Sequence, residues 1–315
     1  MGFSVDSVLK VLKMGREAQA SASSQVGVCV YVDASATPFL VETVRRAFVP
    51  QTVAATVRVR RLSAEPEPLP AETDAVVVVS CGSALLEGAV GRLVSAGAPV
   101  AVVAESSVEA PFIAEDTRLL GLVAATDEAH LRDALARWIL ERTEKTDAFA
   151  ANFPFMRRAA SEKVVKSCAL GNVATGALIW PKGADFPVMT LAQMGMALNL
   201  ASIHGKELSL ERAYELAGVL AAAFALRGTA RRVVPRAGRA GFAVRAVVAG
   251  AGTWAMGLAL TELYERDVDY TKVNEAVAGL VERARSLAAA RHGADASSPL
   301  VPVTAAAPPA RASAA

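Results

Sequence analysis

The sequence of 315 residues contains few charged residues, few aromatic residues and only three cysteines. Charged residues make up 20% of the chain and aromatic residues 5%, whereas hydrophobic residues make up 53% and the mean hydropathy is +0.35. Chains this rich in apolar residues are not intrinsically disordered as a whole. Three cysteines cannot form a disulfide framework, so the composition indicates a reducing compartment and a cytoplasmic location.

An excess of either charge is also missing. Lysine and arginine total 33 and aspartate and glutamate total 31, so the net charge is +2 at pH 7. A broad nucleic-acid surface needs a marked excess of basic residues. We therefore expect no nucleic-acid partner, although a local basic patch is compatible with this balance.

Common catalytic and metal-binding signatures are absent as well. The three histidines, His130, His204 and His292, are far apart in the sequence and have no metal ligand at helical spacing. No Gly-x-Ser-x-Gly motif occurs. The sequence therefore predicts no catalytic residue, no metal and no cofactor.

Residues 1–23 predict a short amphipathic helix and not a secretory signal, because basic residues interrupt the segment. Asp6 is the expected N-cap, and lysines lie opposite an apolar stripe. Such a helix packs on the body of a protein or lies on an anionic membrane surface; the first use is commoner and is favoured. The apolar stripe consists of Val8, Leu9, Val11 and Leu12.

Residues 24–147 alternate apolar strands with helices. Thr37 and Asp127 are the expected N-caps of two helices, and a third helix is expected to begin at Ser83 and end at Gly97. Buried strands separated by helices predict an α/β fold with a doubly wound, mostly parallel sheet. The expected strands are 26–32, 75–79, 99–104 and 119–124, with 56–62 as an edge strand in which apolar and basic residues alternate.

The order of these elements resembles that of a small GTPase domain, but the chemical motifs of that family are missing. The loop 33–38 after the first strand has no glycine and no lysine, whereas a P-loop needs both to hold a phosphate. The later loops lack the magnesium-site aspartate and the guanine-reading motif that the resemblance implies, and no further helix–strand unit is found between Ser106 and Arg118. We therefore predict a degenerate GTPase-like domain that lacks a P-loop and is used for binding.

The loop after strand 75–79 offers one alternative to that prediction. Ser80, Cys81, Gly82 and Ser83 follow the carboxyl end of this strand, and doubly wound sheets bind ligands at that edge. An enzyme that uses the segment Cys81–Ser83 is therefore retained as a second alternative.

Residues 152–285 predict helices only and form an apolar helical bundle in this interpretation. Several segments within 152–266 resemble the YcjF-type domain of unknown function. The most specific is 181–194, in which Ala-Asp-x-Pro precedes a threonine and a glutamine, and the others are 152–157, 171–177, 203–205, 211–216, 224–227 and 252–257. That domain occurs in bacterial inner-membrane proteins and after GTPase domains. The family has no established catalytic residues, so the resemblance implies motif or structural positions only: Pro181, Asp185, Pro187, Thr190, Gln193 and Gly257.

The same residues have a direct physical interpretation. Pro187 suits the first turn of a helix, and Asp185 or Thr190 can accept from the free N–H groups near its start. Gln193 lies among apolar neighbours, which favours a buried amide between helices, and a buried amide needs hydrogen-bond partners. Small residues at four-residue spacing, such as Ala249, Thr253 and Gly257, indicate closely packed helices.

Membrane contact is a second question for this half. The uncharged stretches 167–181, 186–205 and 246–261 are short or contain polar residues, so none is a clean span of about 20 apolar residues. A water-soluble bundle fits, and so does a membrane hairpin with Arg245 and Glu262 near its ends. A basic cluster is interpreted as a solvated loop or as a contact with anionic lipid: Arg227, Arg231, Arg232, Arg236 and Arg239.

These observations predict a non-enzymatic scaffold or adaptor at the cytoplasmic face of the bacterial cell membrane, held peripherally or integrally. The alternative is a soluble regulatory partner of a true GTPase. Residues 292–315 are rich in alanine and proline and are expected to form a disordered tail. The sequence contains no indication of the oligomeric state.

Overall fold

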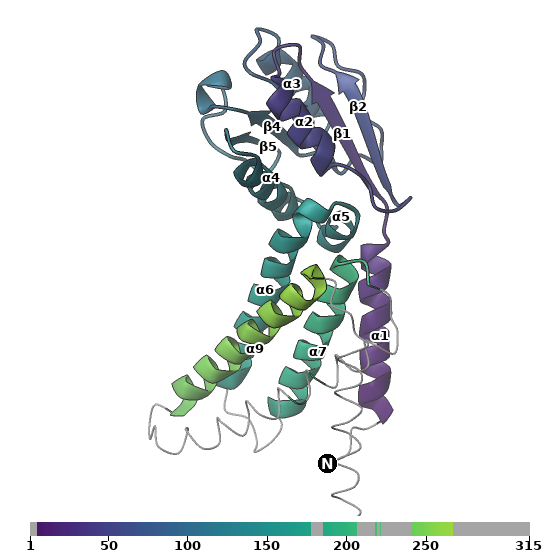
Figure 1. Ribbon diagram of the computed structural model, residues 1–315, viewed down its shortest axis with the longest axis vertical. Helices are drawn as coiled ribbons and strands as arrows, with labels where there is room; N and C mark the ends of the chain where they lie inside the picture. The colour runs from purple at the N-terminus through teal and green to yellow at the C-terminus, as the bar shows by residue number, and fades with distance from the viewer. Residues whose placement is uncertain (1–4, 178–184, 207–217, 219–220, 222–240, 267–315) are drawn as a thin grey trace, which may run out of the picture. The chain divides into compact units, whose positions relative to one another are not determined.

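The computed structural model describes residues 5–177, 185–206, 218, 221 and 241–266 (Figure 1). The predicted tail at 292–315 lies outside these residues. The elements follow one another as α1 (Val5–Ala22), β1 (Val26–Val32), α2 (Pro38–Ala47), β2 (Ala55–Arg61), β3 (Ala75–Val79), α3 (Leu86–Ser95), β4 (Val100–Ala104), the 3-10 turn η1 (Ser107–Glu109), β5 (Leu120–Ala124), α4 (Glu128–Arg142), α5 (Thr146–Asn152), the 3-10 turn η2 (Pro154–Met156), α6 (Arg157–Ala177), α7 (Asp185–Ile203) and α9 (Gly241–Glu265).

The five strands form one sheet in the order β2-β1-β3-β4-β5, and every pair is parallel. Val30 of β1, for example, pairs with Val59 of β2 on one side and with Val77 of β3 on the other. The predicted α/β fold with a parallel sheet is confirmed. β2 lies at an edge, as its alternating sequence predicted, and Val59 is 68% exposed.

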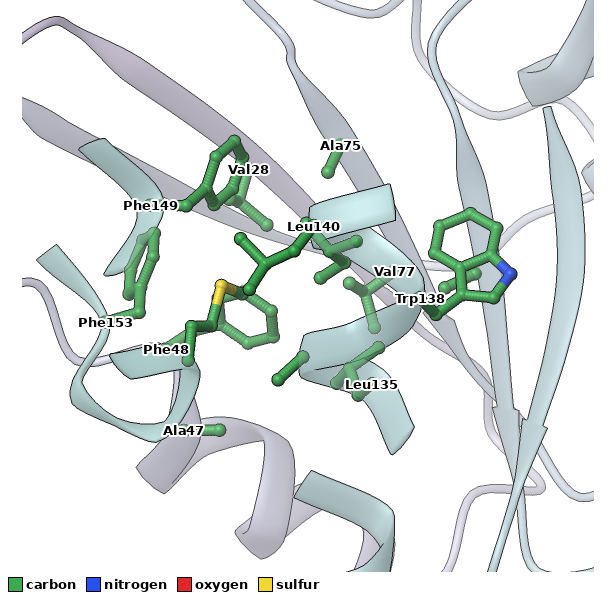
Figure 2. Close-up of a cluster of buried hydrophobic side chains, with 14 of the residues drawn as sticks. Val28, Ala47, Phe48, Ala75, Val77, Leu135, Trp138, Leu140, Phe149 and Phe153 are labelled. Carbon is green, nitrogen blue, oxygen red and sulfur yellow. The ribbon is translucent and has the colours of Figure 1, made fainter. Parts of the chain in front are cut away.

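Helices cover both faces of this sheet because successive strand side chains point to opposite faces. On one face, Val28 and Val77 pack with Leu40 of α2 and Leu135 of α4 (Figure 2). On the other face, Tyr31 and its neighbours pack with α3 and with apolar side chains of the connecting loops. The doubly wound arrangement is therefore present.

The predicted helix starts at Thr37 and Asp127 agree with the structure, whereas those at Asp6 and Ser83 do not, and Asp6 lies within α1. Thr37 and Asp127 are the N-caps of α2 and α4, and Asp127 Oδ2 accepts from the amide of His130 at 2.8 Å. α3 begins at Leu86 and not at the predicted Ser83, because residues 83–85 form a turn after Gly82. Between Ser106 and Arg118 the chain forms only η1 and irregular structure, which agrees with the expected absence of a further helix–strand unit.

The helices α6, α7 and α9 pack on one another, and α1 packs against α7. Val11 of α1, Val165 of α6, Leu200 of α7 and Leu260 of α9 belong to one buried apolar cluster. The predicted apolar stripe of α1 is only partly correct. Val11 is buried, but Leu9 and Leu12, on another side of the helix, are exposed.

α9 is longer than the uncharged stretch 246–261 indicated. Residues Ala243–Glu265 are long and apolar enough to cross a membrane, judged by length and composition alone. Only 39% of the most apolar window of this segment is buried. The expectation that the stretch 246–261 is too short for a span is therefore wrong for α9, since the helix continues past Arg245 and Glu262 at its two ends.

Candidate functional site

The first candidate site lies at the carboxyl edge of the sheet, where the strand order reverses. Asp33 follows β1 and Ser80 follows β3, and these two strands are neighbours. Ligands of doubly wound sheets bind at this reversal. Both residues are buried, and Ser80 Oγ donates to Asp33 Oδ2 at 2.6 Å. Ser35 Oγ donates to the same oxygen at 2.8 Å.

This carboxylate is held in its ionised form. Burial alone would raise the pKa of Asp33, but the hydroxyls of Ser80, Ser83 and Ser35 and the amide of Ala34 outweigh burial and lower it. A carboxylate with a lowered pKa is a weak general base near neutral pH.

The backbone donors of the neighbouring loop are also occupied. The amide of Cys81 donates to Ser35 Oγ at 3.0 Å, and the amide of Gly82 donates to Ser80 Oγ at 3.2 Å. Gly82 has a positive φ of 84°, and a Cβ there would lie 2.9 Å from the carbonyl oxygen of Glu109. Hydrogen bonds thus hold the Asp33 carboxylate and the amides of Cys81 and Gly82, whereas the buried Ser83 hydroxyl has no partner among the described residues.

Side-chain hydrogen bonds also hold the next loop along the same edge. Glu105 follows β4 and accepts a hydrogen bond from Thr37 Oγ1 at 2.5 Å, which connects this loop to the start of α2. Glu109 accepts from the amides of Glu105 and Ser106 at 2.9 and 3.3 Å. These acidic groups therefore serve the local structure of the loop.

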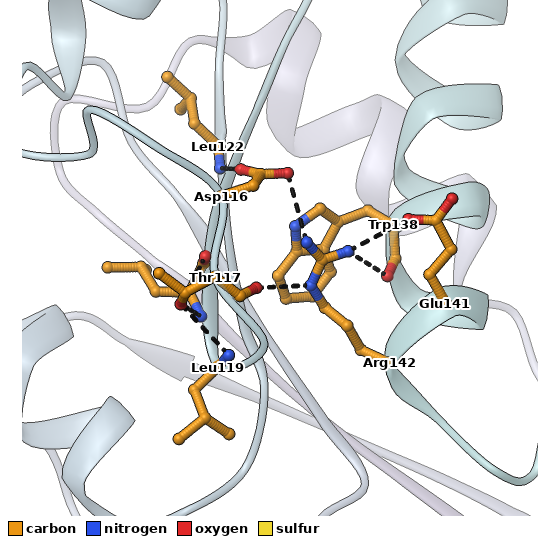
Figure 3. Close-up of polar contacts among 8 residues, drawn as sticks. Asp116, Thr117, Leu119, Leu122, Trp138, Glu141 and Arg142 are labelled. Atoms are coloured by element: carbon orange, nitrogen blue, oxygen red, sulfur yellow. Dashed lines mark hydrogen bonds and ion pairs between the residues drawn. The ribbon is translucent and has the colours of Figure 1, made fainter.

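A cluster of polar contacts joins the loop before β5 to α4 (Figure 3). The Arg142 guanidinium stacks over the Trp138 ring at 4.2 Å and donates from Nε to the carbonyl oxygen of Thr117 at 3.0 Å. It also contacts Asp116 at 3.4 Å. Gly121 makes room for the indole, because a Cβ there would lie 2.0 Å from Trp138 Nε1. This cluster fixes the loop before β5, and a polar hollow of about 350 Å³ lies beside it.

The second candidate site is a buried polar node among α6, α7 and α9. Asn172 Nδ2 and Gln193 Nε2 both donate to Thr253 Oγ1, at 2.8 and 2.9 Å. Thr253 Oγ1 in turn donates to the carbonyl oxygen of Ala249 at 2.8 Å. All three side chains are buried, so the node replaces water with hydrogen bonds that join three helices. The prediction that Gln193 is a partnered, buried amide is confirmed.

Glycines let α6 and α9 approach closely around this node. A Cβ on Gly257 would lie 2.5 Å from a methyl group of Val165, and one on Gly250 would lie 2.3 Å from a methyl group of Val173. The close packing predicted for the small residues is therefore observed. Gly257, a motif position, acts here by its lack of a side chain.

The other motif positions have mixed outcomes. Thr190 lies in the second turn of α7, beyond the free N–H groups of the first turn, and its buried hydroxyl has no hydrogen-bond partner among the residues that the structure describes. The prediction that Thr190 caps this helix is therefore wrong. α7 begins at Asp185, so Pro187 falls in its first turn as predicted, but the side chains of both residues lie outside the description. Outside the described residues lie Pro181 and the basic cluster Arg227, Arg231, Arg232, Arg236 and Arg239.

A third feature is a groove of about 820 Å³ between α4, α6 and α9. One part of its wall is apolar and includes Leu170, Val173 and Trp254. The other part is charged. The charged side chains are Arg137, Glu141, Glu162, Lys163 and Lys166.

Sequence reasoning missed two of these features. Asp33 was interpreted only as a group that repels phosphate, and the hydroxyls around it were not connected to it. Asn172 and Thr253 were assigned to a motif and to a small-residue stripe. A single amide or hydroxyl within a long apolar helix was the available signal, because such a group needs a buried partner.

Comparison of the chain with protein-family models, with curated proteins and with solved structures returned no match. The resemblances to the YcjF-type domain and to small GTPases therefore remain predictions from the sequence.

Proposed function

We propose that this protein is a non-enzymatic scaffold or adaptor at the cytoplasmic face of the cell membrane, with the helices α6, α7 and α9 in contact with lipid. The observation that carries the proposal is the distribution of polarity in these helices. Asn172, Gln193 and Thr253 are buried and bonded to one another, whereas apolar side chains face outward. This distribution is typical of helices that are solvated by lipid.

The outward face of α9 shows the pattern most clearly. Its exposed positions recur every three or four residues and carry no charge from Ala243 to Ala259, a distance of about 24 Å along the helix. Val247 is 66% exposed, and Trp254 and Leu258 are exposed as well. A core helix of a soluble protein is also apolar on all sides, but it is buried on all sides too. The partial burial of α9 therefore favours lipid as its neighbour.

The sheet edge supports the non-enzymatic part of the proposal. The loop after β1 has neither the glycine nor the lysine of a phosphate-binding loop, and its Asp33 carboxylate occupies the hydroxyls of Ser35 and Ser80. A GTPase-like shape without these groups suits a protein that binds a partner. A true GTPase or another protein is the partner that the sequence resemblance implies.

Fractionation of cells that express the full chain tests this function. We expect the protein to stay with the membrane after a carbonate wash and to float with anionic liposomes. Val247→Lys places a charge on the outward face of α9 and should weaken membrane association, because a lysine in a membrane helix costs free energy, up to about 2.5–3.5 kcal/mol at the helix centre.

Val59→Lys is the matched control, since Val59 is equally exposed but lies on β2 of the sheet. It should leave membrane association unchanged. A wild-type chain that remains in the soluble fraction at low salt would contradict the proposal and favour the soluble GTPase partner.

A further inference from the structure

The groove between α4, α6 and α9 has a polar end and an apolar end. Lys166, Leu170 and Val173 follow at helical spacing on one face of α6, and Val247, Ala251 and Trp254 do so on α9. The two helices run in opposite directions, since Val165 lies beside Gly257 and Val173 lies beside Gly250. Trp254 therefore lies between the levels of Lys166 and Val173, while Val247 lies near the level of Gly176, which lies beside Ala246 and Ala249.

The cations at the polar end differ in what they already bind. Arg137 pairs with Asp133 at 2.9 Å and with Glu162 at 3.2 Å. Lys163 donates to the carbonyl oxygen of Leu140 at 2.7 Å and to Thr146 at 3.1 Å. Lys166 is exposed and, within the described part of the chain, has neither an ion pair nor a hydrogen bond.

We propose that this groove binds one anionic phospholipid, with the phosphate on Lys166 and an acyl chain between Val173 and Val247. The proposal rests on the membrane contact proposed above and names the molecule that the surface takes. Charge complementarity selects the headgroup, because Lys166 is the groove cation with no ion pair or hydrogen bond to another described residue. The groove volume of about 820 Å³ lies within the range of about 300–1,000 Å³ found for small-molecule sites.

Trp254 supports the same placement of the lipid. Trp254 is 39% exposed and lines the groove between the levels of Lys166 and Val173. Tryptophan is enriched at the level of lipid headgroups, where one side of the ring is apolar and the other is wet. The lipid phosphate would then lie on the Lys166 side of Trp254, with the acyl chain directed toward the Val173 and Val247 end of the helices.

Native mass spectrometry of the full chain tests this site. The protein is reconstituted in nanodiscs of phosphatidylcholine with phosphatidylglycerol as the minor lipid and is then released in mild detergent. We expect one bound phosphatidylglycerol in preference to phosphatidylcholine. Lys166→Gln should weaken its binding about tenfold, as expected for the loss of a charged hydrogen bond. Ala251→Phe fills the groove and should abolish it.

Two control variants carry the same chemical changes outside the groove. Ala255→Phe changes an exposed position of α9 that does not line it, and Arg58→Gln removes an exposed charge from β2. Both should retain the bound lipid. Equal retention of the two lipids, insensitivity to both groove variants, or equal loss in Arg58→Gln would overturn the site.

The test also separates this site from the proposed function. A chain that enters the nanodisc but carries no bound lipid overturns the lipid site and leaves membrane contact intact. A lipid-free dimer that Ala251→Phe dissociates overturns it as well and assigns the groove to a second copy. A chain that stays outside the nanodisc contradicts both proposals.

Discussion

The sheet region and the helical region place polar and apolar groups in opposite ways. Around the sheet, the buried side chains are valine, leucine and aromatic residues, and the polar cluster of Asp33 lies in the loops at the sheet edge. Among α6, α7 and α9, an amide–hydroxyl node lies at the centre, and apolar side chains such as Val247 face outward. The proposal of lipid contact rests on this difference, because outward apolar side chains around a buried polar node are typical of helices in lipid.

The largest expected effect contrasts two leucines. Leu135 of α4 is buried in the sheet core, whereas Leu258 of α9 is 47% exposed. Leu135→Ala should lower the free energy of unfolding by about 2–5 kcal/mol through lost burial and a cavity. Leu258→Ala should change it by less than about 0.5 kcal/mol. Chemical denaturation in detergent solution measures both, and equal losses would contradict the outward position of Leu258.

The polar node gives the next effect. Thr253→Val removes the shared acceptor and leaves the Asn172 and Gln193 amides unpaired, at a cost of about 1–3 kcal/mol for each buried group. Thr261→Val is the matched control, since the Thr261 hydroxyl donates only to the carbonyl oxygen of Gly257 in its own helix. Thermal unfolding should show a marked loss for Thr253→Val and little change for the control. A node that tolerates the substitution would not be structural.

Two glycines on the helices should respond with opposite signs. Gly257→Ala places a methyl group against the buried side chain of Val165 and should destabilise the protein by about 1–3 kcal/mol. Gly171→Ala meets nothing within 4 Å and should stabilise α6 by about 0.5–1 kcal/mol, because alanine favours helices. Melting temperatures of the two variants report the signs. The same sign for both would mean that α6 and α9 are not in close contact.

The smallest effect concerns pH and two aspartates. The folded state lowers the pKa of Asp33, so its stabilisation is present above the unfolded pKa and is lost as the pH falls through the folded pKa. Burial raises the pKa of Asp147 in α5, although Ser21, Lys163 and Asn199 oppose this. Its contribution is therefore favourable below the unfolded pKa and is lost as the pH rises through the folded pKa.

Substitution by asparagine separates these two groups. At pH 7, Asp33→Asn should destabilise the protein by about 1 kcal/mol, and the difference should shrink in acid. Asp147→Asn should stabilise it at pH 7 and have little effect in acid. Denaturation at several pH values measures both trends. Parallel pH profiles for the two variants would refute the opposite shifts.

The sheet region could be predicted from the sequence almost completely. Each buried parallel strand is a continuous apolar run, and Thr37 and Asp127 mark helix starts through local chemistry. The start of α3 was missed because residues 83–85 form a turn that resembles the first turn of a helix. In this region the strands and helix starts are determined by residues close together in the sequence, so composition and spacing predict them.

The candidate sites were less predictable for a physical reason. Gln193 was identified as a buried amide from its neighbours, but its partner Thr253 lies 60 residues away, and Asn172 lies 81 residues from the same threonine. No sequence pattern within one helix predicts these hydrogen bonds, because they depend on how three helices pack. The groove depends equally on the spatial approach of α4, α6 and α9, and no pattern within one helix contains it.

The position of α1 changes how this chain should be divided. α1 precedes the sheet in the sequence, but it packs on α7, where Met14 lies against Gly195. The strands are therefore an insertion between two segments that complete each other. A fragment that begins near residue 152 would expose the surface of α7 that Met14 covers. During synthesis, α1 can pack on α7 only after more than half of the chain has been made.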